Sequence, residues 1–588
     1  MKLIKYGFAL AIAVCAITSV SMAQTVAFLG GGSPSIFVQL GQAAVIHQDS
    51  LTGLNTACIW TQNVNPGGTI SALDTRNPGT ISETGSVWVV WGPGPNGCAD
   101  PINPSTIYMY TSLESTLALR CYFEVDSSDL KPGCLQIFGA TQGAGHDLLG
   151  LPGPYASPTA NLMLDTAIPA SVIAALNGQH WFVAATEIRP EDAKFATFRA
   201  LQPCGATVYR QPFDQILRQT YGLGYTNTSS ITSDFAFGGN PYHVRDFNIS
   251  GNDPLSNGVV RNYGVSTVGA QAIIVAVGPS SGGIYAANDI PGFVAANFFS
   301  GVLGRASDLL GSTGTNIAPW AVSALIREPL SGIYNAFEYG AINNSQFHTS
   351  QDIGNCAPGS APGDPLHIVS ANGAGLEGGT VQAFRRRVIG TDDMRVQLQN
   401  ANEPDERIGY FYWSYRNVSL NNVKYLTFNG VDPIQDNYSN GTLPSSTGPG
   451  DPCPNQQLHL TCSAVTFKGL NSGDYPLWVA LRIVSQSPTP ASVTALISAA
   501  QTLPSTLFDF VPLTALKVWR SHYSMPGIGV NGAANGSSIS TASDLCNPAG
   551  GALTEQGGDA GGAIILKQAN ADFCSDFGNN SGLINKVE

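Results

Sequence analysis

The sequence predicts an α/β fold with mostly parallel or mixed sheets, because strand-like and helix-like segments alternate along the chain. Short apolar runs such as QAIIVAVGPS and YPLWVALRIV are typical of buried strands. Several strands end in glycine-rich or small polar turns, as in TVAFLGGGSPS and LQIFGATQGAG, from which a helical pattern begins. Strand–turn–helix units of this kind build open α/β sheets.

The first part of the chain contains three such units and one segment of a different kind. Residues 26–29 form the first predicted strand, a run of three glycines forms its turn, and a helix begins at Ser35. GATQGAG and AATEIRPEDA mark the turns of the next two units. In between, residues 47–134 are broken by NPGG, RNPG and GPGPNG and contain the strand-like pieces SVWVVWG and STIYMYTSL. This pattern predicts a β-rich insertion.

The second part continues the alternation. The strand in QAIIVAVGPS precedes the helical segment PGFVAANFFSGVLGRASDLL, and IREPLSGIYNAFEYG contains a helix with Ser331 as its expected N-cap. TVQAFRRRVIGTDDMRVQLQN is predicted to be helical, with Arg385, Arg386 and Arg387 on a solvated face. Strands are expected in RIGYFYWSY, VKYLTFNGVDP and YPLWVALRIV. The Gly/Ala/Ser-rich tail, residues 533–562, is predicted to be loop.

The N-terminus is typical of a secretory signal peptide. Two lysines precede an apolar run, and Ser21, Met22 and Ala23 match a signal peptidase site. The run is too short for a membrane span. We therefore expect a signal peptide over residues 1–23, a mature chain from Gln24 without a membrane span, and a periplasmic or secreted location.

The cysteines favour disulfides over metal ligation. Of eleven cysteines, Cys15 lies in the predicted signal, which leaves an even number, and no CxxC occurs. Connectivity is not readable from sequence, so the pairs suggested by proximity stay open. Those pairs are Cys58 with Cys98, Cys121 with Cys134, Cys453 with Cys462 and Cys546 with Cys574, which leaves Cys204 and Cys356 by elimination.

Charge and motif content exclude several function classes. The formal net charge of −13 argues against nucleic-acid binding, which needs a basic stripe. The eight histidines form no HExxH motif, and no GxSxG occurs. The one His–Asp pair, His146 with Asp147, is expected to lie in a turn or at a helix start. The sequence thus predicts a protein that is not an enzyme, with no cofactor and no metal.

Small or polar residues gather at the ends of the predicted strands. In an open α/β sheet, ligands collect outside the carboxyl ends of strands. Helix starts there offer unpaired N–H groups, and a nearby guanidinium makes the place attractive to an anion. The alternative reading of each motif is an ordinary tight turn, or a capped helix with a surface ion pair. The candidate residues are Ser33, Ser35, Thr141, Glu187, Arg327, Ser331 and Gly332.

The order and content of these motifs resemble the periplasmic phosphate-binding proteins of ABC importers, a branch of the type II periplasmic-binding-protein fold. The resemblance is carried by GGGSPS, GATQGAG, AATEIRPEDA, REPLSGI, PGFVAANFFSGVLG, ERIGYFYWSYRNV and YPLWVALRIV. It covers roughly residues 26–42 and 135–484, with gaps. It implies a first lobe over 24–277, with the β-rich insertion inside it, and a second lobe over 278–475. Residues 476–588 would return to the first lobe and add a C-terminal extension.

The resemblance also implies a role for each candidate residue. Arg327 would clamp phosphate oxygens, Ser331 would donate its hydroxyl, and the N–H of Gly332 would point at the anion. Ser35 or Ser33 would donate from the first helix start and Thr141 from the second, while Glu187 would accept a proton from phosphate. Three residues depart from the family pattern: Pro34 and Ile333 remove donors, and Glu187 is longer than the family's aspartate.

The implied function is binding of a small oxyanion, most simply phosphate, with closure about strands near Val277 and Pro476. An ABC importer membrane complex is the implied partner. A bridge between Cys204 and Cys356 would join the lobes and limit closure. The competing hypothesis is a structural or interaction protein that reuses the fold without its ligand.

Overall fold

The computed structural model describes about two fifths of the chain. The described residues are 24–52, 57–63, 86–101, 105–112, 114–123, 167–188, 207–209, 218–220, 235–237, 240–242, 263–279, 283–299, 303–310, 322–327, 331–337, 341, 368–369, 384–388, 390–399, 406–413, 423–434, 466–503, 510–520 and 564–566. The predicted signal peptide, Thr141, the His146–Asp147 pair and the predicted loop of residues 533–562 lie outside these ranges.

A large mixed sheet organises the described residues and confirms the predicted α/β class. Its strands lie in the order β15-β16-β14-β17-β12-β20-β7-β1-β6-β3-β2, with β18 and β21 paired to β12. Their bounds are β1 Thr25–Gly32, β2 Cys58–Asn63, β3 Ser86–Trp91, β6 Thr106–Ser112, β7 Val183–Thr186, β12 Tyr263–Val277, β14 Val322–Arg327, β15 Ile368–Val369, β16 Phe384–Val388, β17 Glu406–Tyr412, β18 Lys424–Tyr425, β20 Trp478–Gln486 and β21 Val511–Pro512.

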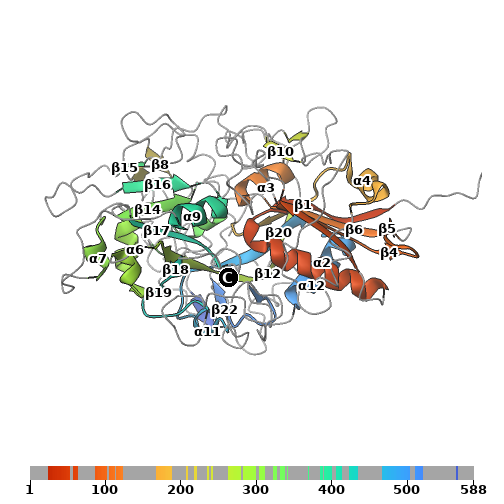
Figure 1. The fold of residues 1–588 in the computed structure, drawn as a ribbon. Helices are drawn as coiled ribbons and strands as arrows, with labels where there is room; N and C mark the ends of the chain where they lie inside the picture. Colours follow the sequence, from red (N-terminus) through yellow and green to blue (C-terminus); the bar gives the residue numbers. More distant parts are fainter. Residues whose placement is uncertain are drawn as a thin grey trace, which may run out of the picture.

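The long strand β12 joins two halves of this sheet. Its residues 263–272 pair antiparallel with β20, whereas residues 273–277 pair antiparallel with β17. We call β20, β7, β1, β6, β3 and β2 the first half, and β17, β14, β16 and β15 the second half. Figure 1 shows the first half on the right and the second on the left, with β12 running between them. The switch of partners lies close to the predicted hinge at Val277, and the lobe boundaries themselves stay a prediction.

Parallel pairing brings the ends of several strands to the same place. In the first half, β1 pairs parallel with both β6 and β7. In the second half, β14 pairs parallel with β16 and with β17. This topology gathers the carboxyl ends of β1, β6 and β7 in the first half and those of β14 and β16 in the second half, where an α/β sheet usually holds its ligand.

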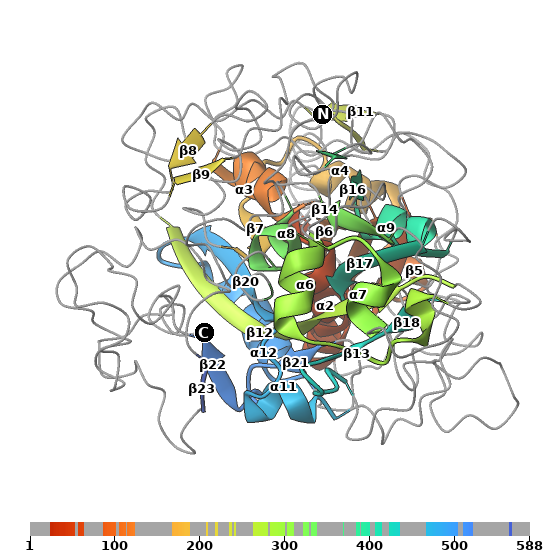
Figure 2. The ribbon, with the colours of Figure 1, turned by 90° about the vertical axis from the view of Figure 1, so that its left-hand side faces the viewer.

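Helices cover both halves. In the first half, α2 and α12 lie side by side on one side of the strands and α3 lies on the other (Figure 1). In the second half, α6 and α8 lie over β14, and α9 packs on β17 (Figure 2). The helices are η1 Pro34–Ile36, α2 Phe37–Thr52, α3 Ser115–Phe123, α4 Ala170–Leu176, η4 Ile284–Ala286, α6 Gly292–Phe299, α7 Ala306–Leu310, α8 Gly332–Phe337, α9 Gly390–Gln399, α11 Lys468–Ser472 and α12 Ala491–Gln501.

Helix α12 illustrates why these segments fold as they do. Pro490 precedes its first residue, a position where the missing N–H of proline costs nothing. Val493, Leu496, Ile497 and Ala500 then follow at helical spacing and are all buried. They join one continuous apolar core that extends into both halves of the sheet. Burial of this stripe, rather than strong capping, therefore holds the helix.

The segment predicted as a β-rich insertion belongs to the main sheet over its described residues. Strand β6 pairs parallel with β1, and β3 and β2 then extend the same edge as antiparallel strands. The hairpin of β4 (Pro93–Gly94) and β5 (Gly97–Pro101) follows β3. The turn-rich spacing correctly predicted strands. It could not reveal that β6 lies at the centre of the first half and leads into helix α3.

A second correction concerns the arginine cluster. Residues 384–388 form strand β16 instead of the predicted helix, and α9 begins only at Gly390. Arg385, Arg386 and Arg387 pair along β14 from Ala324 to Ile326 in a parallel register. Backbone pairing with a buried strand overrides the helical propensity of arginine here.

Other parts of the structure complete the fold. Cys58 and Cys98 form the predicted disulfide, which links β2 to β5. The other suggested cysteine pairs each include a residue outside the described ranges. The remaining strands form small two-stranded sheets: β8 Thr207–Tyr209 with β9 Arg218–Thr220, β10 Phe235–Phe237 with β11 Asn240–Tyr242, β13 Asp289–Ile290 with β19 Thr427–Phe428, and β22 Val518–Arg520 with β23 Ile564–Leu566.

Candidate functional site

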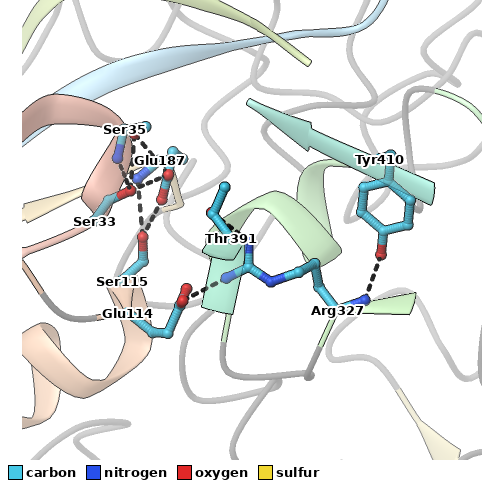
Figure 3. Close-up of polar contacts among 8 residues, drawn as sticks. All are labelled: Ser33, Ser35, Glu114, Ser115, Glu187, Arg327, Thr391 and Tyr410. Atoms are coloured by element: carbon cyan, nitrogen blue, oxygen red, sulfur yellow. Dashed lines mark hydrogen bonds and ion pairs between the residues drawn. The ribbon is translucent and has the colours of Figure 1, made fainter. Parts of the chain in front are cut away.

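A buried polar cluster lies where the ends of β1, β6, β7 and β14 meet. Figure 3 shows its two parts, a carboxylate surrounded by serines and an arginine held by a second carboxylate. We call this cluster the junction site. Its residues are Ser33, Ser35, Glu114, Ser115, Glu187, Arg327, Thr391 and Tyr410.

The carboxylate of Glu187 is the centre of the first part. Glu187 follows β7 and is only 2% exposed. The hydroxyl of Ser35 donates to its Oε1 at 2.7 Å, and that of Ser33 donates to the same oxygen. Ser115 donates its hydroxyl to Oε2. Three hydroxyls from two different strand ends therefore point at one group, as they would at any small oxyanion.

The backbone around these serines fixes their positions. Ser33 donates its N–H to the carbonyl of Ala185 on β7 at 2.9 Å, and its hydroxyl accepts from Ser35 N at 3.1 Å. A side chain on Gly32 would overlap the carbonyl of Ala185, so only glycine permits this close approach of the turn to β7. Close packing against β7 therefore explains the glycine at this position, whether or not a ligand binds nearby.

Arg327 is the centre of the second part. It ends β14 and is fully buried, and its Nη2 forms an ion pair with Glu114 Oε1. Its Nη1 donates to Thr391 Oγ1 at 2.9 Å, from the start of α9. Its backbone N–H donates to the hydroxyl of Tyr410 at 3.3 Å, and the Tyr410 ring stacks on Phe337 of α8 at a centroid distance of 3.8 Å. These contacts orient the guanidinium towards the first half of the sheet.

Ser331 and Gly332 bring the start of α8 to the same place. Ser331 is fully buried immediately before the helix. A Cβ on Gly332 would overlap Oε2 of Glu187 and lie 2.6 Å from Ser115 Oγ. The backbone of the second half therefore touches the carboxylate that the first half holds, and glycine is the residue that allows it.

Two further residues set the electrostatics of the site. Tyr110 of β6 donates its hydroxyl to the carbonyl of Ser33 at 2.6 Å. Burial raises the pKa of Tyr110 well above its ordinary 10.0, and the nearby charges of Glu187 and Glu114 raise it further. Arg482 of β20 is fully buried and donates from Nη1 to the backbone carbonyl of Glu187. The site is therefore dry and holds charges of both signs.

The structure brings most of the predicted residues together. Ser33 and Ser35 donate to Glu187, Gly332 lies against the same carboxylate, Arg327 pairs with Glu114, and Ser331 precedes Gly332. Thr141 lies outside the described residues. The roles proposed for these side chains in binding a ligand stay predictions.

Sequence reasoning missed six residues of the cluster and its surroundings. They are Tyr110, Glu114, Ser115, Thr391, Tyr410 and Arg482. A signal for Ser115 was present, because the apolar strand TIYMYTS is followed by Leu-Glu-Ser-Thr and a helix, the same pattern as in the three recognised units. It was hidden by the hairpin turns on its N-terminal side.

The described residues contain neither a membrane-spanning helix nor a metal-binding cluster. No helix within these ranges is long and apolar enough to cross a membrane. Among the same residues, no group of three or more His, Cys, Asp or Glu side chains is arranged to hold a metal ion.

Comparisons with known proteins give only distant likenesses. No protein-family model and no curated protein matches the chain. A phosphate-binding protein from Stenotrophomonas maltophilia is 13% identical over 59% of this chain and 80% of its own, with a TM-score of 0.27. An ABC-type phosphate transport receptor from Vibrio cholerae is 14% identical over 42% and 68%, with a TM-score of 0.23.

A third structure, PstS from Borrelia burgdorferi, is 15% identical over 41% of this chain and 67% of its own, with a TM-score of 0.22. The structural similarity to phosphate-binding proteins is thus distant and partial. TM-scores this low carry no argument about the ligand of this chain.

Proposed function

We propose that this chain is an exported solute-binding protein that holds a small oxyanion at the junction site. Phosphate is the ligand that we propose first. One observation carries the proposal. The hydroxyls of Ser33, Ser35 and Ser115 from the first half point at one buried carboxylate, that of Glu187, and the buried guanidinium of Arg327 from the second half pairs with Glu114, the residue next to Ser115. Charge-assisted hydrogen bonds from several hydroxyls and an arginine are the usual way in which a protein holds a small oxyanion.

An anion would enter this arrangement by exchange of hydrogen bonds. The serine hydroxyls would turn from Glu187 to the anion oxygens, and Glu187 would accept a hydrogen bond from an O–H of the ligand in return. Such an exchange favours an anion that still carries a proton, because a buried carboxylate facing an unprotonated anion costs free energy. Phosphate meets this condition near neutral pH and sulfate does not.

Unsatisfied hydroxyls beside Ser115 support the same proposal. Thr111, Ser112 and Thr116 are fully buried, and their hydroxyls have no hydrogen-bond partner among the described residues. Each buried hydroxyl left in this state costs roughly 1–3 kcal/mol. Such hydroxyls call for a partner, which a bound anion or an ordered water would supply.

The export part of the proposal has separate support. The disulfide between Cys58 and Cys98 fits an oxidising compartment. The N-terminal pattern predicts a signal peptide that directs the chain there. An ABC importer remains a proposed partner, inferred from the sequence resemblance alone.

A second candidate function is favoured by a different observation. Glu187 already accepts the three hydroxyls, and Glu114 already neutralises Arg327. These two side chains occupy the donors that an anion would use. In a protein that reuses the fold as a structural or interaction scaffold, such internal pairs would replace the ligand permanently.

Calorimetric titration of the purified, phosphate-free protein separates the two candidates. We expect phosphate to bind with a Kd of about 1 μM or tighter, and sulfate to bind much more weakly. Ser115→Ala should weaken phosphate binding about tenfold or more, because a hydrogen bond to a charged group is worth about 1.5–3 kcal/mol.

Ser105→Ala is the matched control for that substitution. Ser105 is also fully buried, and its hydroxyl accepts from Gly92 N at 2.9 Å, but it lies before β6 at the end opposite to Ser115. Its replacement should leave the Kd unchanged. If a folded wild-type protein gave no heat with either anion, the oxyanion proposal would be wrong and the scaffold would be preferred.

A further inference from the structure

Glu114 is a second buried carboxylate at the junction site, and its position is unusual. Its backbone carbonyl accepts the first hydrogen bond of α3, from Ala118 N at 3.0 Å, so it occupies the N-cap position. An N-cap side chain commonly bonds its own helix. That of Glu114 instead forms an ion pair with Arg327, 213 residues further along the chain. One oxygen of this carboxylate therefore lies at the site, against Arg327 of the second half.

The charges around Glu114 balance before any ligand is considered. Arg327 and Arg482 contribute two positive charges, and Glu114 and Glu187 contribute two negative ones, among the described residues that face this place. Two tyrosines lie beside them: Tyr110 keeps its proton, because burial and the two carboxylates raise its pKa, and Tyr410 accepts from the backbone N–H of Arg327. The formal sum over these described residues is zero, so they leave each negative charge of a ligand in this dry site uncompensated. A monoanion is therefore favoured over a dianion.

The hydrogen-bonding groups of the site lead to the same choice. Serine hydroxyls and the guanidinium are donors that suit unprotonated oxygens of an anion. The carboxylates of Glu114 and Glu187 accept only, and each has two oxygens with about four lone-pair sites. Two acceptors that face a ligand require two O–H groups on it. Dihydrogen phosphate has two, hydrogen phosphate has one and sulfate has none.

We infer that Glu114 is a specificity-determining residue, which makes the site selective for a doubly protonated tetrahedral monoanion such as dihydrogen phosphate. The inference rests on the proposed oxyanion function and adds the protonation state of the ligand. It assigns to Glu114 a role that Glu187 alone does not supply. With Glu187 as the only carboxylate, the singly protonated dianion would be accepted equally well.

Replacement of Glu114 by glutamine tests this role. The amide oxygen of glutamine still accepts from Arg327 Nη2, so the link between the two halves is kept while one negative charge is removed. Glu406→Gln is the matched control, because Glu406 is another fully buried glutamate and accepts from Ile284 N at 2.9 Å in the second half. Phosphate and sulfate are titrated by calorimetry into the wild type and both variants, on the acidic and the alkaline side of neutral pH.

The wild type should bind phosphate more tightly on the acidic side, where the monoanion predominates. In Glu114→Gln, the preference for phosphate over sulfate should fall by at least about tenfold, and the pH dependence of phosphate binding should flatten. Glu406→Gln should behave as the wild type. If Glu114→Gln kept the wild-type selectivity and pH dependence, the inference would be wrong and oxyanion binding would stand. If no protein bound any anion, the proposed function would fail and the inference with it.

A measurement on the wild type tests the same inference even if the Glu114→Gln variant does not fold. The phosphorus-31 chemical shift of bound phosphate reports its protonation state. We expect the bound signal to keep the shift of the monoanion while free phosphate titrates through neutral pH. A bound signal at the shift of the dianion would overturn the inference without any substitution.

Discussion

Replacement of Arg327 by methionine is expected to lower the free energy of unfolding by about 3–5 kcal/mol, as when one partner of a buried ion pair is removed. The guanidinium is fully buried, and the side chain of its partner Glu114 is 3% exposed. Without Arg327, Glu114 keeps its charge in a place that water does not reach. Urea unfolding followed by tryptophan fluorescence measures the loss.

Two further variants isolate the cause of this loss. Combining Arg327→Met with Glu114→Leu removes both charges, and the double variant should recover most of the stability, because apolar replacement of a whole buried pair is often neutral. Arg395→Met is the matched control, since Arg395 bonds Gln399 on the same helix and is partly exposed. Its cost should stay near 0.5 kcal/mol. An Arg327 variant no less stable than the Arg395 variant would show that the cross-sheet pair contributes no more than a surface contact.

Replacement of Gly332 by alanine is expected to destabilise the protein by about 1–3 kcal/mol and to weaken phosphate binding at least about tenfold. Alanine is the better helix former by about 1 kcal/mol, so propensity alone predicts the opposite sign. The added methyl group would overlap Oε2 of Glu187 and press on Ser115 Oγ. Glu187 would have to move, and its hydrogen bonds with the serines would be lost or distorted.

Gly264→Ala is the matched control for this substitution. Gly264 lies in β12, and a Cβ there would meet its nearest atom, Cβ of Ser487, at 3.9 Å. This change should leave phosphate affinity unaltered, and the free energy of unfolding should stay the same or rise slightly. Equal effects of the two substitutions on phosphate affinity would contradict the placement of Gly332 against the Glu187 carboxylate.

The elements of this fold that could be predicted are those with a local signal. Apolar runs predict strands β1, β7, β12, β17 and β20, because a strand buried on both faces has few alternatives. The parallel pairing of β1 with β6 is set by packing across more than 70 residues of chain, and no local pattern reports it. For this reason residues 47–134 were predicted as an addition to the fold, although β6 lies inside it.

Some residues of the candidate site also have a local sequence signal, and others have none. Ser33, Ser35, Arg327 and Ser331 stand at strand ends and helix starts, which are visible in the sequence. The partner of Arg327 could not be predicted, because Glu114 precedes a helix in another part of the chain and resembles any exposed N-terminal glutamate. Whether a charged side chain forms an ion pair depends on which strand end lies opposite it, and only the assembled sheet determines that.

Binding of a tetrahedral oxyanion in the place between Ser115 and Arg327 is the central claim. Diffraction from crystals grown with arsenate, recorded at the arsenic absorption edge, tests this claim most directly. We predict one strong anomalous peak among the side chains of Ser33, Ser115 and Arg327, with the serine hydroxyls turned from Glu187 towards the arsenate. Crystals without a peak at this place, in which Glu187 still holds all three hydroxyls, would contradict the claim.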